Sequence, residues 1–257
     1  MGRLRAWLGN GFQSFLGAIT FYSCIPVPQY WGLKFERIAR WAPIIGVLLG
    51  AIVGTVDGGL KGVGMPVGTR SAVVVALGVA LTGGLHLDGA IDTADGLAVM
   101  DRQRRLAAMQ DSVVGAFGAI AAATLLVLKT TALSDIEVHR TWALMAAAGW
   151  GRWGQVVAIA LYPYLKPTGK GAFHKENIRL PQDVLLGVLV LLGLSGSFLV
   201  VFPVEQSWFW ATIGGGGAIA FLTGYGFHRQ LGGHTGDTYG AVVEWTEAFL
   251  LCFLTLF

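Results

Sequence analysis

The stretch Gly83-Gly-Leu-His-Leu-Asp-Gly-Ala-Ile-Asp-Thr-Ala-Asp-Gly96 places three aspartates directly after a long apolar run that begins at Ser71. If that run continues as a helix, the spacing i, i+4, i+7 puts Asp88, Asp92 and Asp95 on one face. Carboxylates this close repel one another and stay ionised only when a cation lies between them. Oxygen ligands suit Mg²⁺, Mn²⁺ or Ca²⁺ and argue against zinc or copper. The sequence therefore predicts a cation site at the end of this helix.

The rest of the chain is strongly apolar. Of its 257 residues, 54% are hydrophobic and 13% are charged, whereas about a quarter of the residues in a soluble protein are charged. The mean hydropathy is +0.62, which indicates an integral membrane protein whose partner is the lipid bilayer. A net charge of +3 is too small for a nucleic-acid binder. The two cysteines, Cys24 and Cys252, are far apart in apolar segments and do not indicate a disulfide framework.

The apolar runs predict an all-α, polytopic membrane protein. A spanning helix needs about 20 apolar residues. A shorter run at 12–25, ended by Pro26 and Pro28, predicts a re-entrant or interfacial helix. Because no repeat or linker interrupts the pattern, we expect a single transmembrane catalytic domain over residues 1–257. Seven runs are candidate spans: 41–57, 70–87, 113–134, 141–162, 184–204, 207–227 and 239–257.

The distribution of lysine and arginine predicts the orientation of these spans. Basic residues gather in the segments 28–40, 88–112 and 163–183, which the positive-inside rule places in the cytoplasm. Alternation of the seven spans puts these three segments and 228–238 on the same side. We therefore expect the polar segments to meet at the cytoplasmic face of the membrane.

A second polar segment complements the aspartates. It reads Gly232-Gly-His-Thr-Gly-Asp-Thr-Tyr-Gly-Ala-Val-Val-Glu244, and Asp237 is a further candidate metal ligand. A helix that begins near Thr238 offers free N–H groups to an anion, and Gly233 and Gly236 let backbone approach a ligand closely. Acidic residues beside a glycine-rich helix start favour a metal-bridged phosphate or pyrophosphate, with Gly233, Gly236 and Thr238 as substrate contacts.

Basic residues are candidates for contacts to such a phosphate. Arg104, Arg105 and Lys170 lie in the predicted cytoplasmic segments, where the arginines could equally serve only as topology determinants. Arg152 lies inside a predicted span and needs an anion, so it either pairs with an aspartate at membrane depth or reaches substrate phosphate. Lys129 is expected to snorkel toward the outer surface.

Proton acceptors and histidines complete the candidate residues. Asp111 or Glu244 could accept the proton of a nucleophile, although Asp111 also suits an N-cap of the following span. His86 and His234 flank the acidic segments. Each is read first as a structural histidine with satisfied hydrogen bonds, and second as a ligand or proton relay.

Taken together, the motifs resemble the cobalamin synthase family. The resemblance is carried by Gly83–Gly96, Asp111–Gly118, the Gly151-Arg152-Trp element and Gly232–Ala241, with Phe15–Pro28 also similar. It covers essentially the whole chain in order. It implies an enzyme of a prokaryotic plasma (inner) membrane that joins adenosylcobinamide-GDP to α-ribazole or α-ribazole 5′-phosphate, requires Mg²⁺ and releases GMP.

The resemblance also suggests how the candidate residues act. Mg²⁺ held by the four aspartates would clamp the GDP pyrophosphate, while the basic residues Arg104, Arg105, Lys170 and Arg152 balance charge on the transferred phosphoryl group. The expected nucleophile is the ribazole 5′-oxygen, and Asp111 or Glu244 takes its proton.

Two other classes of protein remain as alternatives. A CDP-alcohol phosphatidyltransferase uses a similar metal site, with the pattern Asp-x-x-Asp-Gly-x-x-Ala-Arg. The Ala-Arg element of that pattern is missing from this sequence. An ion-coupled transporter also carries intramembrane acids, but it predicts polar groups spread over two repeated halves. The sequence leaves the oligomeric state open and is compatible with a homo-oligomer.

Overall fold

The computed structural model describes residues 2–111, 113–166, 169 and 171–257, and within them the fold is all-helical, as predicted. Short 3₁₀ turns at Gln29–Trp31 and Ile38–Trp41 and a π turn at Ala211–Gly215 join or extend the α-helices. The α-helices are α1 (Gly2–Tyr22), α2 (Ala42–Gly62), α3 (Val67–Leu81), α4 (Leu85–Ala98), α5 (Arg102–Ala108), α6 (Ala116–Asp135), α7 (Arg140–Leu161), α8 (Ala172–Asn177), α9 (Gln182–Val201), α10 (Gln206–Trp210), α11 (Gly216–Leu231) and α12 (Gly236–Leu254).

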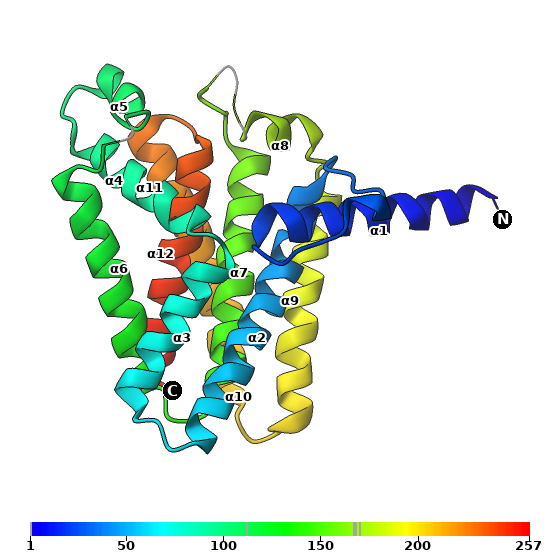
Figure 1. The fold of residues 1–257 in the computed structure, drawn as a ribbon, viewed down its shortest axis with the longest axis vertical. Coiled ribbons are helices and arrows are strands. Elements are labelled where there is room, and N and C mark those ends of the chain that lie inside the picture. The colour runs from blue at the N-terminus through cyan, green and yellow to red at the C-terminus, as the bar shows by residue number, and fades with distance from the viewer. Residues whose placement is uncertain (1, 112, 167–168, 170) are drawn as a thin grey trace.

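Helix α7 is the centre of a bundle whose long helices run along the long axis of the molecule (Figure 1). It packs against α2, α9, α11 and α12, and most of its residues are buried. Glycines on α2 make the closest of these contacts possible. A Cβ at Gly50 would lie 2.6 Å from the carbonyl oxygen of Leu144, and one at Gly46 would collide with the backbone of Ala148. Small residues thus let two helix backbones approach where lipid offers no hydrophobic driving force.

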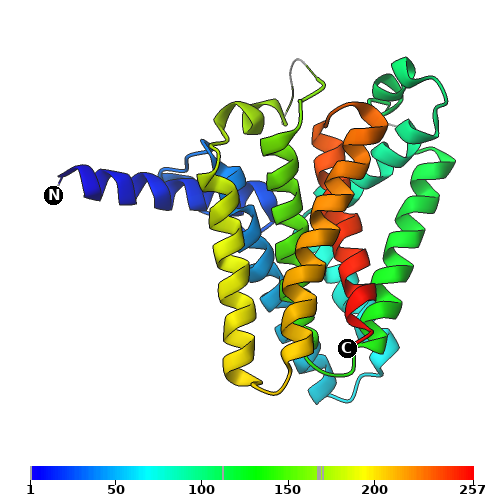
Figure 2. The ribbon, with the colours of Figure 1, turned by 180° about the vertical axis from the view of Figure 1, so that it is seen from behind.

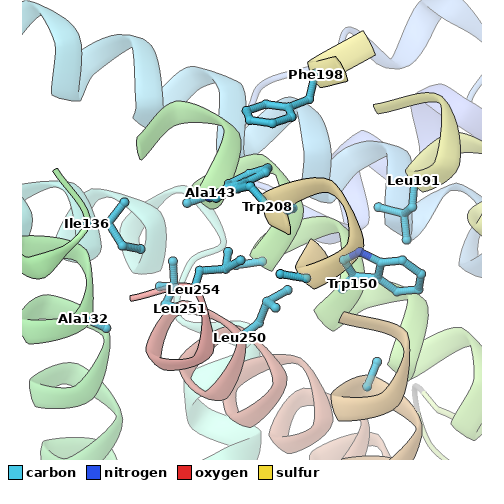
Figure 3. Close-up of a cluster of buried hydrophobic side chains, with 14 residues drawn as sticks. Ala132, Ile136, Ala143, Trp150, Leu191, Phe198, Trp208, Leu250, Leu251 and Leu254 are labelled. Carbon is cyan, nitrogen blue, oxygen red and sulfur yellow. The ribbon is translucent and has the colours of Figure 1, made fainter. Parts of the chain in front are cut away.

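A hydrophobic core fills the end of the bundle that holds the C-terminus (Figure 3). The rings of Phe198 on α9 and Trp208 on α10 stack with centroids 4.3 Å apart, and Leu250 and Leu254 of α12 pack against the same cluster. This core leaves the opposite end of the bundle, where α4, α5 and α8 lie, to the polar segments (Figure 1).

Three helices in the described part of the chain are long and apolar enough to cross a membrane: Ile38–Gly62, Ala116–Asp135 and Gln182–Val201. The bent pair α3–α4 counts as a fourth at most, so the structure supports fewer spans than the seven predicted. Helices α7 and α12 occupy two of the other predicted ranges, but both carry buried charged residues. Helix α11 has 16 residues and follows the π turn.

The predicted continuous span 70–87 is wrong. Helix α3 ends at Leu81, and α4 begins at Leu85 after a bend of 91°. The backbone at Gly83 and Gly84 is left-handed, with φ of +61° and +73°, a conformation that favours glycine and stops a helix. Helix α4 therefore lies across the bundle instead of extending α3 (Figure 1). The spacing of its three aspartates still places them on one helix face.

The N-terminal helix is longer than the predicted 12–25 segment. Helix α1 lies across the bundle and extends well beyond it, as both views show (Figures 1 and 2). Only its C-terminal part packs on the fold, through contacts with α2 and the Ile38–Trp41 turn.

Candidate functional site

The candidate site forms where α4 crosses the beginning of α12. A Cβ at Gly89 would lie 2.5 Å from the carbonyl oxygen of Asp237, and one at Gly240 would lie 2.9 Å from that of His86. The two glycines thus let the helix backbones touch. This contact places Asp88 and Asp237 at one pocket and within electrostatic reach of Asp92, although Asp237 comes from a distant part of the sequence.

The clustered carboxylates influence one another. Burial and the negative charges of Asp88, Asp237 and Asp95 all disfavour the ionised form of Asp92, and the positive charge of Lys166 opposes their effect. Lys166 donates a hydrogen bond of 2.9 Å from Nζ to Asp237 Oδ2. Negative charge therefore exceeds positive charge at this site, and a bound cation would relieve the repulsion.

The donor set fits a hard divalent cation by chemistry and charge. Asp88, Asp92 and Asp237 offer oxygen atoms only, which Mg²⁺ prefers. As their side chains are placed, no three acidic, histidine or cysteine side chains in the described residues converge on one ion position. The ammonium group of Lys166 instead pairs with one of the three carboxylates.

Asp95 makes contacts within the fold that the sequence did not predict. Its two carboxylate oxygens each accept a hydrogen bond of 2.8 Å, from the N–H groups of Gly115 and Gly118. A Cβ at either glycine would collide with this carboxylate. Asp95 therefore holds the N-terminal turn of α6, and this contact accounts for the glycines of the Asp111–Gly118 motif.

Asp111 does not cap the following helix, contrary to the alternative considered from the sequence. Helix α6 begins at Ala116, with Gly115 at its N-cap position, and Asp95 already binds its free N–H groups. Asp111 is exposed, and its carboxylate accepts a hydrogen bond of 3.1 Å from the N–H of Val113.

The predicted basic contacts separate into different environments. Arg105 donates to two backbone carbonyls, Val99 at 2.9 Å and Gln230 at 3.0 Å, and so ties α5 to the end of α11. Arg104 is exposed on the same short helix. Lys170 lies outside the described residues.

The glycine-rich segment builds the start of α12. Thr235 is the N-cap, and the hydroxyl of Thr238 accepts a hydrogen bond of 2.8 Å from the Thr235 N–H, which completes a capping box. Thr238 is fully buried, so its hydroxyl serves the fold. Gly233 packs against the backbone of Pro163, whereas Gly236 lines a pocket beside Asp237.

His234 is a structural histidine, as the first of the two readings predicted. It is fully buried, with Nδ1 3.0 Å from the hydroxyl of Thr238 and Nε2 3.2 Å from the carbonyl oxygen of Gly224. Both ring nitrogens are therefore engaged within the fold.

Four charged side chains form a buried network deeper in the bundle. Lys129 Nζ lies 2.7 Å from Glu244 Oε2 and 2.6 Å from Glu247 Oε2, and Arg152 donates to Glu247 Oε1 at 2.7 Å. The expectation that Lys129 snorkels is wrong, because two glutamates one turn apart on α12 hold it inside. Arg152 pairs with a carboxylate as the structural alternative required, although the partner is a glutamate. Glu244 is engaged by Lys129 and lies outside the Asp88–Asp237 pocket.

The pocket beside the carboxylates has a volume of about 170 Å³ and is lined by Asp88, Asp237, His86, Gln155 and His174, among others. Sequence reasoning missed Gln155, which lies in a predicted apolar span, and His174, which lies in the basic segment 163–183 but in none of the motifs. Only the crossing of α4, α7, α8 and α12 brings these side chains together.

Comparison with known proteins agrees with the motifs. The sequence profile of the family described as cobalamin-5-phosphate synthase matches residues 14–255. The adenosylcobinamide-GDP ribazoletransferase of Trichormus variabilis is 56% identical over 94% of this chain and 96% of its own length. That of Synechocystis sp. is 49% identical over 96% of this chain and 95% of its own length. No solved structure matches the chain. The expected resemblance is thus confirmed, and the chain belongs to the cobalamin-5-phosphate synthase family of enzymes.

Proposed function

We propose that this protein is a Mg²⁺-dependent membrane transferase that joins adenosylcobinamide-GDP to α-ribazole or α-ribazole 5′-phosphate and releases GMP. The products are adenosylcobalamin or its 5′-phosphate, at the end of cobalamin nucleotide-loop assembly. The contact of Gly89 with Asp237 carries the proposal, because it gathers carboxylates from two family motifs at one pocket. Relatives that bear this enzyme name over nearly the whole chain support it.

Asp88, Asp92 and Asp237 are the proposed metal ligands. When bound, Mg²⁺ would neutralise pyrophosphate oxygens and make GMP a better leaving group. Asp95 supports this site indirectly, since it fixes α6 against α4. Arg104 and Lys170 are the proposed phosphate contacts from flanking segments.

The nucleophile is a ribose hydroxyl of the acceptor. Its oxygen forms a bond to the phosphorus that carries cobinamide, the bond from that phosphorus to the bridging oxygen breaks, and GMP leaves with the electron pair. Because the 5′-oxygen of α-ribazole 5′-phosphate is already esterified, a reaction common to both acceptors uses a secondary hydroxyl and not the 5′-oxygen expected above. Asp111 is the proposed proton acceptor, since Lys129 engages Glu244.

We also propose that the chain crosses the membrane seven times. Helices α7, α11 and α12 cross the bilayer with the three clearly apolar spans and the bent pair α3–α4, for seven crossings in all. The charged side chains of α7 and α12 face each other inside the bundle, where they avoid lipid. The end that carries α5 and α8 faces the cytoplasm, because its connecting segments hold most of the basic residues.

Purified protein in proteoliposomes tests this function. With adenosylcobinamide-GDP, α-ribazole and Mg²⁺ we expect GMP release, and with CDP-diacylglycerol in place of the cobinamide donor we expect no release of CMP. Asp92→Asn should abolish turnover or shift its Mg²⁺ dependence to much higher concentrations. Unchanged turnover and unchanged Mg²⁺ dependence in this variant would contradict the metal assignment, and turnover of CDP-diacylglycerol would favour the phosphatidyltransferase alternative.

A further inference from the structure

The pocket next to Asp88 and Asp237 contains polar side chains that the fold does not use. His86, His174 and Gln155 are only 2%, 3% and 4% exposed. Neither ring nitrogen of the two histidines, nor Oε1 of Gln155, has a hydrogen-bond partner among the described residues. Buried polar groups are normally paired, because an unpaired one destabilises the folded state. Three of them around one pocket indicate a ligand that supplies the missing partners.

The histidine rings are held by aromatic packing and not by hydrogen bonds. The ring of Tyr22, at the end of α1, lies nearly parallel to both imidazoles, with centroids 6.4 Å from His86 and 6.0 Å from His174. Phe21 adds an edge-on contact to His174 at 5.0 Å. The orientation of the imidazoles is thus fixed while their nitrogen atoms stay free to bind.

The unpaired side chains of the pocket suit an uncharged ligand. Burial lowers the pKa of His174 to about 4, so its imidazole is neutral at pH 7 and offers one donor and one acceptor. Gln155 adds a carbonyl acceptor. The described residues that line the pocket include the carboxylates of Asp88 and Asp237 but no lysine or arginine. With Asp88 and Asp237 engaged as the proposed Mg²⁺ ligands, the hydrogen-bonding atoms that remain in the lining belong to neutral side chains, which suit hydroxyl groups.

The size of the pocket limits which uncharged ligands can fit. A volume of about 170 Å³ is smaller than the roughly 300–1,000 Å³ of pockets for drug-sized ligands. It therefore suits one small ring and excludes a whole nucleotide or a corrin. An uncharged small ring rich in hydroxyl groups is a ribose, which both the acceptor and the guanosine of the donor contain.

We propose that this pocket binds the ribose of the acceptor nucleoside, with His86, His174 and Gln155 bonding its hydroxyl groups. The acceptor is favoured over guanosine because an attacking hydroxyl must lie beside the reacting phosphorus, whereas the guanosine ribose is one phosphate further away. The pocket meets this requirement, since Asp88 and Asp237 form part of its wall. This inference rests on the proposed function and assigns positioning and specificity to three further residues.

Steady-state kinetics in proteoliposomes test the assignment with two variants that keep side-chain volume but remove hydrogen-bonding atoms, His174→Phe and Gln155→Leu. We expect each variant to raise the KM for α-ribazole by roughly tenfold, the effect of about one lost hydrogen bond. The KM for adenosylcobinamide-GDP should stay within about twofold, because those contacts lie elsewhere.

Thermal stability separates this role from a structural one. Each variant replaces an unpaired buried polar group by an apolar one, so the Tm of the substrate-free protein should be unchanged or higher. His234→Phe provides the contrast, because His234 is equally buried but fully hydrogen-bonded, and its Tm should fall. His139→Asn is the kinetic control. His139 lies at the opposite end of the bundle with a φ of +58°, which asparagine tolerates, so neither KM should change.

The outcomes distinguish this inference from the function on which it rests. Absence of GMP release by the wild-type protein would contradict the proposed function, and the inference with it. If wild-type protein turns over but both variants leave the KM for α-ribazole unchanged, only the inference is wrong. A selective rise in the KM for adenosylcobinamide-GDP would assign the pocket to guanosine. A fall in Tm without a change in KM would assign the side chains to the fold.

Discussion

Gly89 packs directly on the backbone of Asp237, so closely that a Cβ on Gly89 would lie 2.5 Å from the Asp237 carbonyl oxygen. Gly89→Ala should therefore push α4 away from α12 and separate Asp88 and Asp92 from Asp237. Because displacements of about 1 Å at reacting groups can cost on the order of 100-fold in rate, we expect a loss of kcat of that order. Measurement of GMP release in proteoliposomes checks it.

Gly193→Ala is the matched control for this substitution. Gly193 lies on α9, and a Cβ there meets no atom within 4 Å. Since alanine is a better helix former than glycine, the control should keep full activity and equal or higher Tm. Equal activity of the two variants would mean that the α4–α12 contact does not position the site.

Removal of the charge should have opposite effects on stability at Asp92 and at Asp95. Asp92 is repelled by its neighbours, so Asp92→Asn should leave the Tm without Mg²⁺ unchanged or raise it. Mg²⁺ at tenfold its Kd should stabilise the wild-type protein by about 1.4 kcal/mol, and Asp92→Asn should lose this increment. Thermal unfolding in detergent with Mg²⁺ or EDTA measures both effects. A full Mg²⁺-induced shift in Asp92→Asn would remove it from the ligand set.

Asp95→Asn should instead destabilise the protein with and without Mg²⁺. The carboxylate accepts two backbone hydrogen bonds at the start of α6, and an amide can accept on one side only. The loss should be about 1–3 kcal/mol, as for a buried donor left unpaired. If Asp95→Asn kept its stability and lost only the Mg²⁺ response, the predicted ligand role would be restored.

The helices of the bundle could be predicted from the sequence far better than the break between α3 and α4. Apolar runs at 113–134 and 141–162 nearly coincide with α6 and α7, because burial in lipid or in the bundle selects the same apolar residues. The prediction of one continuous span over 70–87 was wrong. Glycine is common in membrane helices, so the sequence alone does not reveal that Gly83 and Gly84 both adopt a left-handed backbone.

The site was predictable as a set of acids but not as a set of contacts. The spacing within one helix places Asp88 and Asp92 together, since that relation is local. Lys129 pairs with Glu244 and Glu247, which are 115 and 118 residues away, and no local pattern connects them. The hydrogen bonds of Asp95 to the start of α6 could not be predicted for the same reason, because they join residues that are 20 and 23 positions apart. Pairing between helices depends on their packing, which glycines such as Gly89 and Gly240 determine.

Lys129 should be essential for stability because it neutralises two buried glutamates. Lys129→Met would leave Glu244 without its cation and Glu247 with Arg152 only. Breaking a buried ion pair costs about 3–5 kcal/mol, so the Tm in detergent should fall strongly. Lys61→Met on the exposed end of α2 controls for the loss of one positive charge and should change stability by less than about 0.5 kcal/mol. Similar Tm values for both variants would contradict this role.

A second buried network joins helices at the end of the bundle opposite the site. Asp57 on α2 accepts hydrogen bonds from Arg140 Nε at 2.8 Å and Nη2 at 2.7 Å, and Arg70 Nε lies 2.9 Å from the same carboxylate. All three side chains are buried. Asp57→Asn would leave two guanidinium groups without an anion, which should cost about 3–5 kcal/mol of stability.

Because Asp57 is remote from Asp237, this loss should not extend to catalysis. At a temperature where Asp57→Asn is fully folded, we expect its kcat and both KM values to equal those of the wild-type protein, while its Tm is much lower. Asp237→Asn should show the reverse pattern, since it removes a proposed ligand from a partly exposed position. A fall in kcat of folded Asp57→Asn would show that the two ends of the bundle are coupled, through α2 and its close contact with α7.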